Sequence, residues 1–409
     1  MSEQAGTISP PAGAEERWLT PGVKGIGAAS LLSDLGHEIP TALLPSFLTS
    51  TLGAPAAALG LIEGVADGLA GAAKFAGGPL ADDPQRRRNT AVGGYAATAV
   101  LTAAIGATTQ VWQVAALRAG GWAARGLRVP ARNALLADVV PASAYGRAYG
   151  FERAMDNLGA IGGPLLAILL VALIGTRSAI LVSVVPGLLA VAAILYAVRK
   201  APKLEERERK PLRFQVRPVL RGQLGRLFIG IGAFEAGNAA ATLLILRATD
   251  LLDEQHSHDS AVTIALLLYA GYNLAATLAS LQGGRLGDRR GMLTVLALGV
   301  AAFLIAYIGF AFTNGTIVTL AAAFLVAGIG IGFVETAEHA AVATHAADDI
   351  RGSAFGLLAA TQSFGNLIAS AIAGALWTLV SPKAAFLFLA AAMVVSLASF
   401  ALGREARAT

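Results

Sequence analysis

The sequence predicts an all-α membrane protein with twelve transmembrane helices in two pseudo-symmetric six-helix bundles. Three observations lead to this fold class. The 409-residue chain is 55% hydrophobic and only 14% charged, whereas a soluble domain carries about a quarter charged residues. Apolar stretches of about 20 residues, each long enough to span a bilayer, recur along the chain. Finally, the two halves share motifs at a constant spacing, which indicates an internal duplication.

Two unrelated motifs carry this repeat. Residues 78–82 read Gly-Pro-Leu-Ala-Asp, and residues 284–288 read Gly-Arg-Leu-Gly-Asp. Residues 146–150 and 352–356 share the pattern Gly-x-x-aromatic-Gly. Both motifs return after the same shift of 206 positions. Two like halves of six membrane helices each are typical of secondary transporters.

The apolar stretches place the membrane spans in order along the chain. Several are longer than the hydrocarbon core requires, so we expect them to tilt or to continue into water as ordinary helix. The predicted spans are 23–47, 54–80, 89–108, 110–128, 148–173, 177–198, 224–249, 261–286, 292–312, 315–339, 353–380 and 383–402.

These spans divide the chain into two bundles, residues 23–198 and 223–403. The charged, proline-flanked segment 199–222 joins them as a linker on the membrane surface. Residues 1–22 contain no basic region before an apolar core and no small-residue cleavage site, so they predict a cytoplasmic tail rather than a signal peptide. Residues 404–409 form a second cytoplasmic tail.

The formal charge of +5 is explained by membrane topology and does not indicate a nucleic-acid partner. The loop arginines and lysines fall mainly on one side of the twelve-span arrangement, and the other side keeps little beyond Arg177, Arg247 and Lys383. This positive-inside pattern predicts a multi-pass protein of the bacterial inner membrane with both termini in the cytoplasm. The chain has no cysteine, which excludes disulfides and thiol chemistry. We expect a monomer in the lipid bilayer.

The repeated motif carries a family resemblance. Gly-x-Leu-Ala-Asp followed by basic residues is the loop signature between the second and third helices of the major facilitator superfamily, and the chain resembles this family over nearly its whole length. The first copy departs from the signature at Asp83 and Gln85, and the second copy is cleaner. The matching residues are Gly78, Leu80, Ala81, Asp82, Arg86 and Arg87, then Gly284, Leu286, Asp288, Arg289 and Gly291.

The resemblance implies a cavity lined by spans 1, 4, 7 and 10, and transport driven by the proton gradient without a bound cofactor. Arg118 in the fourth span resembles an arginine linked to proton coupling in drug exporters. Residues 159–164 loosely resemble the glycine-proline motif of the family's antiporters. Residues 61–64 and 125–133 resemble a bacterial subgroup of exporters.

Ionisable residues inside the spans are functional candidates, because charge in a bilayer is costly. Asp34, His37 and Glu38 share one face of the first span through their i, i+3, i+4 spacing. They predict a proton or cation site, and Asp34 with His37 is the candidate if a metal is bound. The alternative is a buried polar cluster that ties the first span to a neighbour.

Two further spans contribute to the predicted cavity. In the second, Glu63 and Asp67 lie one turn apart, and they suit either proton binding or an interhelical salt bridge near the cytoplasmic gate. In the seventh, Glu235 and Asn238 are spaced i, i+3 and can face the cavity.

A second group is predicted to brace the cytoplasmic gate. Asp82 and Asp288 should cap helix N-termini or pair with arginine. Asp156, at the start of the fifth span, should latch onto the first motif loop. Glu335, Glu338 and His339 should form gate ion pairs, with substrate contact as the alternative. The remaining gate residues are Arg86, Arg87, Arg125, Arg128, Arg132 and Arg289.

The sequence contains no phosphate-binding loop and no convincing nucleophile–base pair, so an enzyme or an ATP-driven pump is not expected. The leading hypothesis is a proton-coupled exporter of a small amphipathic or cationic compound that works by alternating access. A divalent metal exporter for nickel, cobalt or iron, with the same fold, is the alternative. A sensor or scaffold that does not transport is the third hypothesis.

Overall fold

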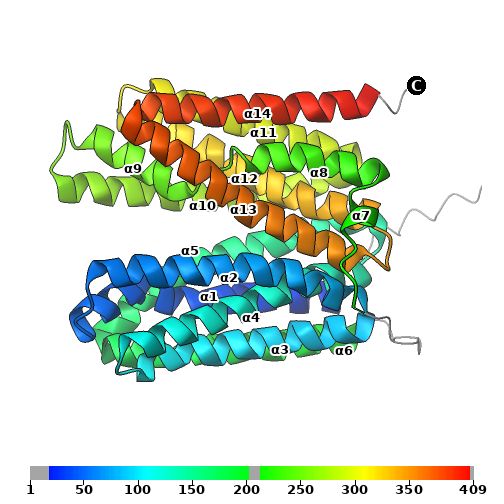
Figure 1. Cartoon of the computed structure of the whole chain (residues 1–409), viewed down its shortest axis with the longest axis horizontal. Helices are drawn as coiled ribbons and strands as arrows, with labels where there is room; N and C mark the ends of the chain where they lie inside the picture. The colour runs from blue at the N-terminus through cyan, green and yellow to red at the C-terminus, as the bar shows by residue number, and fades with distance from the viewer. Residues whose placement is uncertain (1–17, 202–211, 406–409) are drawn as a thin grey trace, which may run out of the picture.

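The computed structural model describes residues 18–201 and 212–405, and every regular element in these ranges is helical. Parts of the predicted tails and linker, residues 1–17, 202–211 and 406–409, lie outside the described residues. The helices form two bundles that lie one above the other in Figure 1.

The first bundle contains six long helices and covers the first half of the chain. A π-helical turn, Phe47–Thr51, extends α1, and short 3-10 turns follow α3 and precede α5. Its long helices are α1 (Pro21–Ser46), α2 (Ala56–Asp82), α3 (Pro84–Ala104), α4 (Val111–Asp138), α5 (Tyr145–Val182) and α6 (Val184–Lys200).

The second bundle follows a single-turn helix, α7 (Val216–Val219), and repeats the arrangement with one helix interrupted. Its members are α8 (Gly222–Glu235), α9 (Ala241–Leu252), α10 (His258–Arg290), α11 (Met292–Phe312), α12 (Ile317–His345), α13 (Arg351–Leu379) and α14 (Pro382–Glu405).

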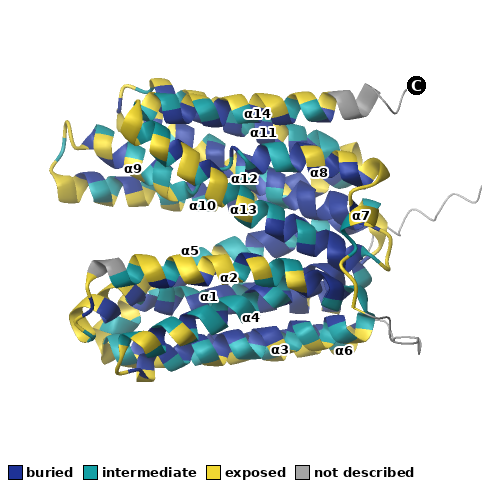
Figure 2. Cartoon of the chain, in the orientation of Figure 1, coloured by how far each residue is buried: buried dark blue, intermediate teal, exposed yellow. Residues whose placement is uncertain are grey.

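Seven helical segments of the described chain are long and apolar enough by themselves to cross a membrane. They are α3, α5 and α10 to α14, some with short extensions. The charged helices α1, α2 and α4 are not among them, and neither are the two pieces α8 and α9. Figure 2 shows buried residues inside each bundle and where the bundles meet, with exposed residues on the outside. Large apolar side chains such as Leu61 and Ile168 are 70% exposed, which is expected of a protein whose surface is largely covered by lipid.

The seventh span is where the predicted helix is wrong. The sequence predicts one continuous span over 224–249, but the structure ends α8 at Glu235 and begins α9 at Ala241. Glycine and asparagine, both weak helix formers, occupy positions 237 and 238. Gly237 also packs closely against Ala392 and Met393 of α14. The backbone freed by the break is satisfied from α13, because Ser370 accepts from the Ala240 amide at 2.8 Å and Asn366 donates to the Asn238 carbonyl at 2.8 Å.

The fourth span is longer than predicted. The sequence ends it at residue 128, but α4 continues as regular helix to Asp138. Its added turns carry Arg132 and Asn133 into the buried interior, where both side chains are at most 5% exposed. A cluster of charged residues indicates the end of a helix only where lipid surrounds it. The charged residues of α4 are instead surrounded by other helices of the protein.

The two bundles meet at the end where the chain passes from one to the other, which we call the linker end. Helix α5 packs on α10 and α2 packs on α13 there, and the bundles splay apart toward the opposite end. Glycines allow this close approach. A side-chain carbon at Gly150 would collide with the Ser280 carbonyl, and one at Gly352 would collide with the backbone of Ala81 and Asp82. The repeated Gly-x-x-aromatic-Gly motif is therefore the contact surface between the halves.

Candidate functional site

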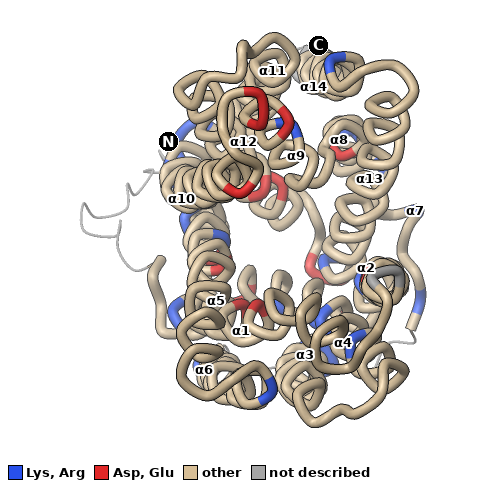
Figure 3. The backbone as a smooth tube through the Cα atoms, turned by 90° about the vertical axis from the view of Figure 1, so that its left-hand side faces the viewer, with Lys and Arg blue, Asp and Glu red and all other residues tan. Residues whose placement is uncertain are grey.

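A cavity of about 660 Å³ lies between the bundles, within the size range of small-molecule sites. Figure 3 views the molecule from the open side, with α5 beside α10 and α2 beside α13 on the two flanks. The first bundle lines the cavity from α2, α4 and α5, and the second bundle lines it from the α8–α9 break, α12 and α13.

The wall from the first bundle is rich in basic side chains. Five cations line the cavity against two carboxylates, Asp67 and Asp156. The cations are Lys74, Arg125, Arg128, Arg132 and Arg153. Buried charge of this kind is tolerated when partners lie close, so the pairing of each cation decides what the wall can bind.

Arg125 pairs with the predicted cluster of the first span. Its Nη2 lies 3.2 Å from the Asp34 carboxylate, and its Nη1 contacts the His37 ring. The His37 ring is also 3.3 Å from the Glu38 carboxylate. The three residues predicted to share a helix face therefore do so, and an arginine placed by sequence at the gate is their partner. A guanidinium occupies the position next to Asp34 and His37 that a bound cation would need.

Arg118 is held in a second, neighbouring cluster. It lies 3.0 Å from the Glu63 carboxylate and donates to the Thr41 hydroxyl at 3.0 Å. The ring of Trp122 lies between Arg118 and Arg125, with their guanidinium carbons 4.4 Å and 5.1 Å from its centroid. Cation–π contacts of this kind stabilise arginines out of water. Asp67, by contrast, is exposed on the cavity wall.

Glu152 organises the third cluster. It is fully buried and accepts from Ser30 at 2.6 Å, while Arg132 and Arg153 each lie 2.7 Å from its carboxylate. Asp156 completes the group at 3.2 Å from Arg153 and 3.5 Å from Arg132. The predicted latch from Asp156 to the first motif loop does not form in this structure, because Arg132 of α4 and Arg153 of α5 engage its carboxylate.

Two cations of this wall have no carboxylate partner among the described residues. Lys74 donates to the Ser363 hydroxyl of α13 at 2.7 Å, and thus reaches across to the second bundle. Arg128 is 2% exposed and lies over the Tyr95 ring of α3 at 3.8 Å, and its Nε and Nη1 have no hydrogen-bond partner in the part of the chain that the structure describes.

The wall from the second bundle has the opposite character. Glu235 and Glu335 line the cavity, and no lysine or arginine of this bundle joins them within the described chain. Glu235 is the last residue of α8, and Asn238 in the break donates to its carboxylate at 3.0 Å. The C-terminal end of a helix carries partial negative charge. The N-terminus of α9 lies in the same break and carries the opposite partial charge, so the negative potential of this wall comes from the carboxylates themselves.

Glu338 and His339 lie on α12, one turn from Glu335. Glu338 is fully buried, and one oxygen accepts from Gln362 at 2.9 Å while the other has no hydrogen-bond partner among the described residues. His339 lines the cavity, donates from Nδ1 to the Glu335 carbonyl at 2.7 Å, and faces the rings of Tyr149 and Phe355. None of these three residues forms an ion pair with a lysine or arginine within the described ranges.

At the linker end, the repeated aspartates cap helices of the opposite bundle, as their sequence context predicts. Asp82 accepts from the Ser353 amide at 2.8 Å and from its hydroxyl at 2.5 Å, at the start of α13. Asp288 accepts from the Gly146 amide at 2.7 Å and from the Arg147 side chain at 2.7 Å, at the start of α5.

Further residues join the same end of the molecule. Arg87 pairs with Asp138 at 2.5 Å, and Arg351 of the second bundle approaches the same carboxylate at 3.7 Å. Arg86 is half-buried nearby, and Arg289 is exposed on the last turn of α10. Only some of the residues that the sequence predicts for the gate therefore lie at the linker end. The others line the cavity, and these are Arg125, Arg128, Arg132, Asp156, Glu335 and His339.

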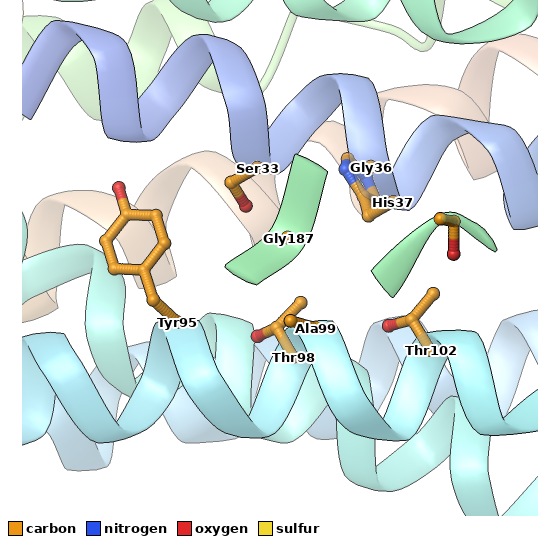
Figure 4. Close-up of a pocket in the computed structure, with 9 residues that line it drawn as sticks. Ser33, Gly36, His37, Tyr95, Thr98, Ala99, Thr102 and Gly187 are labelled. Atoms are coloured by element: carbon orange, nitrogen blue, oxygen red, sulfur yellow. The ribbon is translucent and has the colours of Figure 1, made fainter. Parts of the chain in front are cut away.

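A separate, water-sized cavity of about 10 Å³ lies inside the first bundle between α1, α3 and α6. Figure 4 shows the hydroxyl groups of Ser33, Thr98 and Thr102 around it, with the Tyr95 ring at one side and His37 at the other. It is large enough for about one water molecule.

Sequence reasoning missed the polar face of α13. Gln362, Ser363, Asn366 and Ser370 line the cavity or hold the helix break. Positions 362, 366 and 370 recur every four residues in an otherwise apolar helix. That helical period was the available signal.

Comparison with known proteins supports the duplicated architecture. The family model described as Major Facilitator Superfamily matches residues 26–252 and again residues 227–409. An uncharacterized MFS-type transporter of Methanocaldococcus jannaschii is 28% identical over 394 residues, covering 93% of this chain and 94% of that protein. An uncharacterized protein of Mycobacterium tuberculosis is 29% identical over 343 residues, covering 82% and 81%.

Solved structures share the fold at low identity. A bacterial homologue of the iron transporter ferroportin, in an outward-facing state, matches with a TM-score of 0.77 and 14% identity, covering 94% of this chain and 99% of that one. The transporter FucP in its outward conformation matches with a TM-score of 0.70 and 16% identity, covering 93% and 98%. The human organic anion transporter MFSD10 matches with a TM-score of 0.70 and 16% identity, covering 93% and 99%.

Proposed function

The chain belongs to the Major Facilitator Superfamily, and we propose that within it the protein is a proton-coupled exporter of a small compound that carries a positive charge. It works as a monomer in the bacterial inner membrane, by rocking of the two bundles around the central cavity. The basic linker end is the cytoplasmic end, so the state described here opens to the outside. The proton gradient supplies the energy, without a bound cofactor.

The observation that carries this proposal is the acidic wall of the second bundle. Glu235 and Glu335 line the cavity, and no basic residue of their own bundle joins them in the described chain. In the first bundle, by contrast, Asp34 and Glu63 each have an arginine within 3.2 Å. A cationic ligand is therefore better matched to Glu235 and Glu335.

The same carboxylates explain exchange with protons. Glu235 is 2% exposed, and a buried carboxylate that has released its cation is stabilised by taking up a proton instead. Proton and substrate then compete for one site, so inward proton flow drives the substrate outward. Asp34 is the second candidate for a titrating group, because its protonation would release Arg125 and change the first-bundle wall.

The metal alternative gains no support from the predicted ligands. Arg125 lies 3.2 Å from Asp34 and contacts His37, so a divalent cation there would meet a fixed positive charge. No cluster of three or more His, Cys, Asp or Glu side chains suited to a metal ion occurs among the described residues. The resemblance to the ferroportin homologue, at 14% identity, is one of fold.

Calorimetry on the detergent-purified protein tests the proposal, with cadaverine, agmatine and tetraphenylphosphonium as cationic probes. Titrations in two buffers of different ionisation heat measure the protons released on binding. We expect binding to weaken as pH falls, and Glu235→Gln to reduce affinity about 10- to 100-fold, the equivalent of one charge-assisted interaction.

The control is Glu254→Gln, which removes an exposed carboxylate from the loop after α9 and should change neither affinity nor proton release. Proton release measured with Asp34→Asn and with Glu235→Gln shows which of the two candidate proton sites titrates when a cation binds. Binding of all three probes that is indifferent to pH and to Glu235→Gln would reject the proposal.

A further inference from the structure

A short segment at the linker end contacts both bundles. Residues 212–221 contain the single-turn helix α7 and lead into α8. Before α7, the ring of Phe214 stacks on Phe75 of α2 in the first bundle, with centroids 5.1 Å apart and an interplanar angle of 12°. At the end of α7, Val219 is fully buried, and α7 packs against α13 of the second bundle. Residues 212–221, which we call the strap, therefore connect α2 with α13, the two helices that meet there.

The exposed side of the strap combines unpaired positive charge with apolar side chains. Its sequence contains three arginines and no acidic residue. These arginines are exposed, and their side chains form no hydrogen bond or ion pair within the described chain; they are Arg213, Arg217 and Arg221. Large apolar side chains that are 50–61% exposed alternate with them, namely Leu212, Phe214 and Leu220.

The position of the strap corresponds to the membrane–water interface. Figure 1 places α7 at the linker end of the molecule. In Figure 3, viewed from the opposite end, α7 lies on the outer side of the flank formed by α2 and α13. No residue of the strap lines the central cavity. In a segment at this place, apolar side chains can enter the boundary of the acyl chains while cations meet the headgroups.

Charge determines which headgroup the strap prefers. Phosphatidylcholine carries a cation that offsets its phosphate, whereas phosphatidylglycerol has a net negative charge. A guanidinium forms paired, charge-assisted hydrogen bonds with phosphate oxygens. Each basic residue near a membrane surface strengthens the attraction to anionic lipid about fivefold. Two engaged arginines are therefore sufficient for a clear preference.

We infer that the strap binds the headgroup of an anionic phospholipid, and that the bound lipid favours the closed linker end. Opening of this end separates α2 from α13, so the strap would lose its contact with one of them. A lipid held by the arginines and the apolar side chains of the strap opposes that separation. The inference is independent of the compound that the cavity carries.

Native mass spectrometry of the detergent-purified full chain tests the binding site. The chain is mixed with equal amounts of phosphatidylglycerol and phosphatidylcholine that have the same acyl chains. We expect the wild type to retain phosphatidylglycerol at least about tenfold over phosphatidylcholine. The double variant Arg217→Gln, Arg221→Gln should reduce this preference to below about threefold. Because both arginines are exposed, the change removes charge without removing buried packing.

The matched control is the double variant Arg199→Gln, Lys200→Gln. It removes the same charge from the exposed last turn of α6, which belongs to the same charged linker region but does not form part of the strap. The lipid preference of this variant should equal that of the wild type.

Spin-label distances between the linker-end tips of the bundles test the effect on closure. They are measured in nanodiscs of phosphatidylcholine alone and of three parts phosphatidylcholine to one part phosphatidylglycerol. Anionic lipid should raise the ratio of closed to open populations about three- to tenfold in the wild type, and less than about twofold in Arg217→Gln, Arg221→Gln. Phe214→Ala removes the stacking on Phe75 but keeps the arginines, so it should retain the lipid preference and lose the closure.

Three results would overturn the inference. A preference for phosphatidylglycerol that is absent from the wild type, or equal in the Arg217→Gln, Arg221→Gln variant and the control, rejects the binding site. Equal linker-end distances in the two lipid compositions reject the role in closure. Arginine-dependent binding of soluble poly-L-glutamate without a lipid preference would instead identify an acidic protein as the partner.

Discussion

Glu152 illustrates how the first bundle keeps arginines inside a membrane protein. Its carboxylate is fully buried and lies within 2.7 Å of both Arg132 and Arg153. Each arginine alone would be very costly at this depth. Because one carboxylate and the nearby Asp156 neutralise both, the cluster can serve as a fixed part of the cavity wall rather than as a titrating site.

This gives a stability prediction. Glu152→Gln keeps the size of the side chain but removes its charge, so two buried guanidinium groups lose their main partner. We expect a loss of about 3–5 kcal/mol, the usual effect of breaking a buried ion pair. The apparent unfolding temperature in detergent measures it.

Glu63→Gln is the comparison, because Glu63 is 31% exposed and serves only Arg118. It should cost clearly less, since a partly exposed pair is screened by water. Equal losses in the two variants would contradict the role assigned to the Glu152 cluster.

Individual residues also show how much of this site can be predicted from the sequence. The spacing of Asp34, His37 and Glu38 correctly places them on one helix face. Their partner Arg125 could not be identified, because it lies 91 positions from Asp34 and its neighbours are basic residues that resemble the end of a span. Pairing between helices depends on packing, which sequence periodicity does not encode.

At the scale of helices, the sequence again predicts some features and misses others. The repeated motifs predict that Asp82 and Asp288 cap helices, and both do so across the bundle interface. The break between α8 and α9 was not predicted, because the segment 224–249 is apolar enough to suggest a continuous helix. Its stability depends on Ser370 and Asn366 of α13, which replace the lost backbone hydrogen bonds.

The two caps are unequal, and their difference is testable. Asp288 accepts two backbone amides and also pairs with Arg147 at 2.7 Å. Asp82 accepts from the Gly352 and Ser353 amides and the Ser353 hydroxyl, but among the described residues it forms no ion pair with the helix that it caps. We expect Asp288→Asn to open the linker end more than Asp82→Asn. A contribution of about 1.4 kcal/mol shifts a two-state balance tenfold.

Spin-label distances between the linker-end tips of the two bundles measure this opening, with the unmodified chain as reference. Asp83→Asn is the control, because Asp83 caps α3 within its own bundle. An opening by Asp82→Asn that equals or exceeds that of Asp288→Asn would contradict the ranking.

The assembled molecule brings these features into one mechanism. Both bundles meet at the linker end through glycines and caps, and between them lies a cavity whose walls differ in charge. Composition and the 206-residue repeat were sufficient to predict the twelve-helix, two-bundle family fold. The charge asymmetry of the cavity was not predictable, because it depends on which cations are neutralised by neighbours within their own bundle.

Proton exchange at the second-bundle wall is the central claim, and everted membrane vesicles test it most directly. Respiration acidifies their interior, and a pH-sensitive dye reports the gradient. A cationic probe that binds the purified protein, added to vesicles containing the wild-type chain, should release interior protons and restore dye fluorescence. Vesicles containing Glu235→Gln at matched abundance should show no recovery. Full recovery in the Glu235→Gln vesicles, or no recovery with the wild-type chain despite binding, would contradict the account.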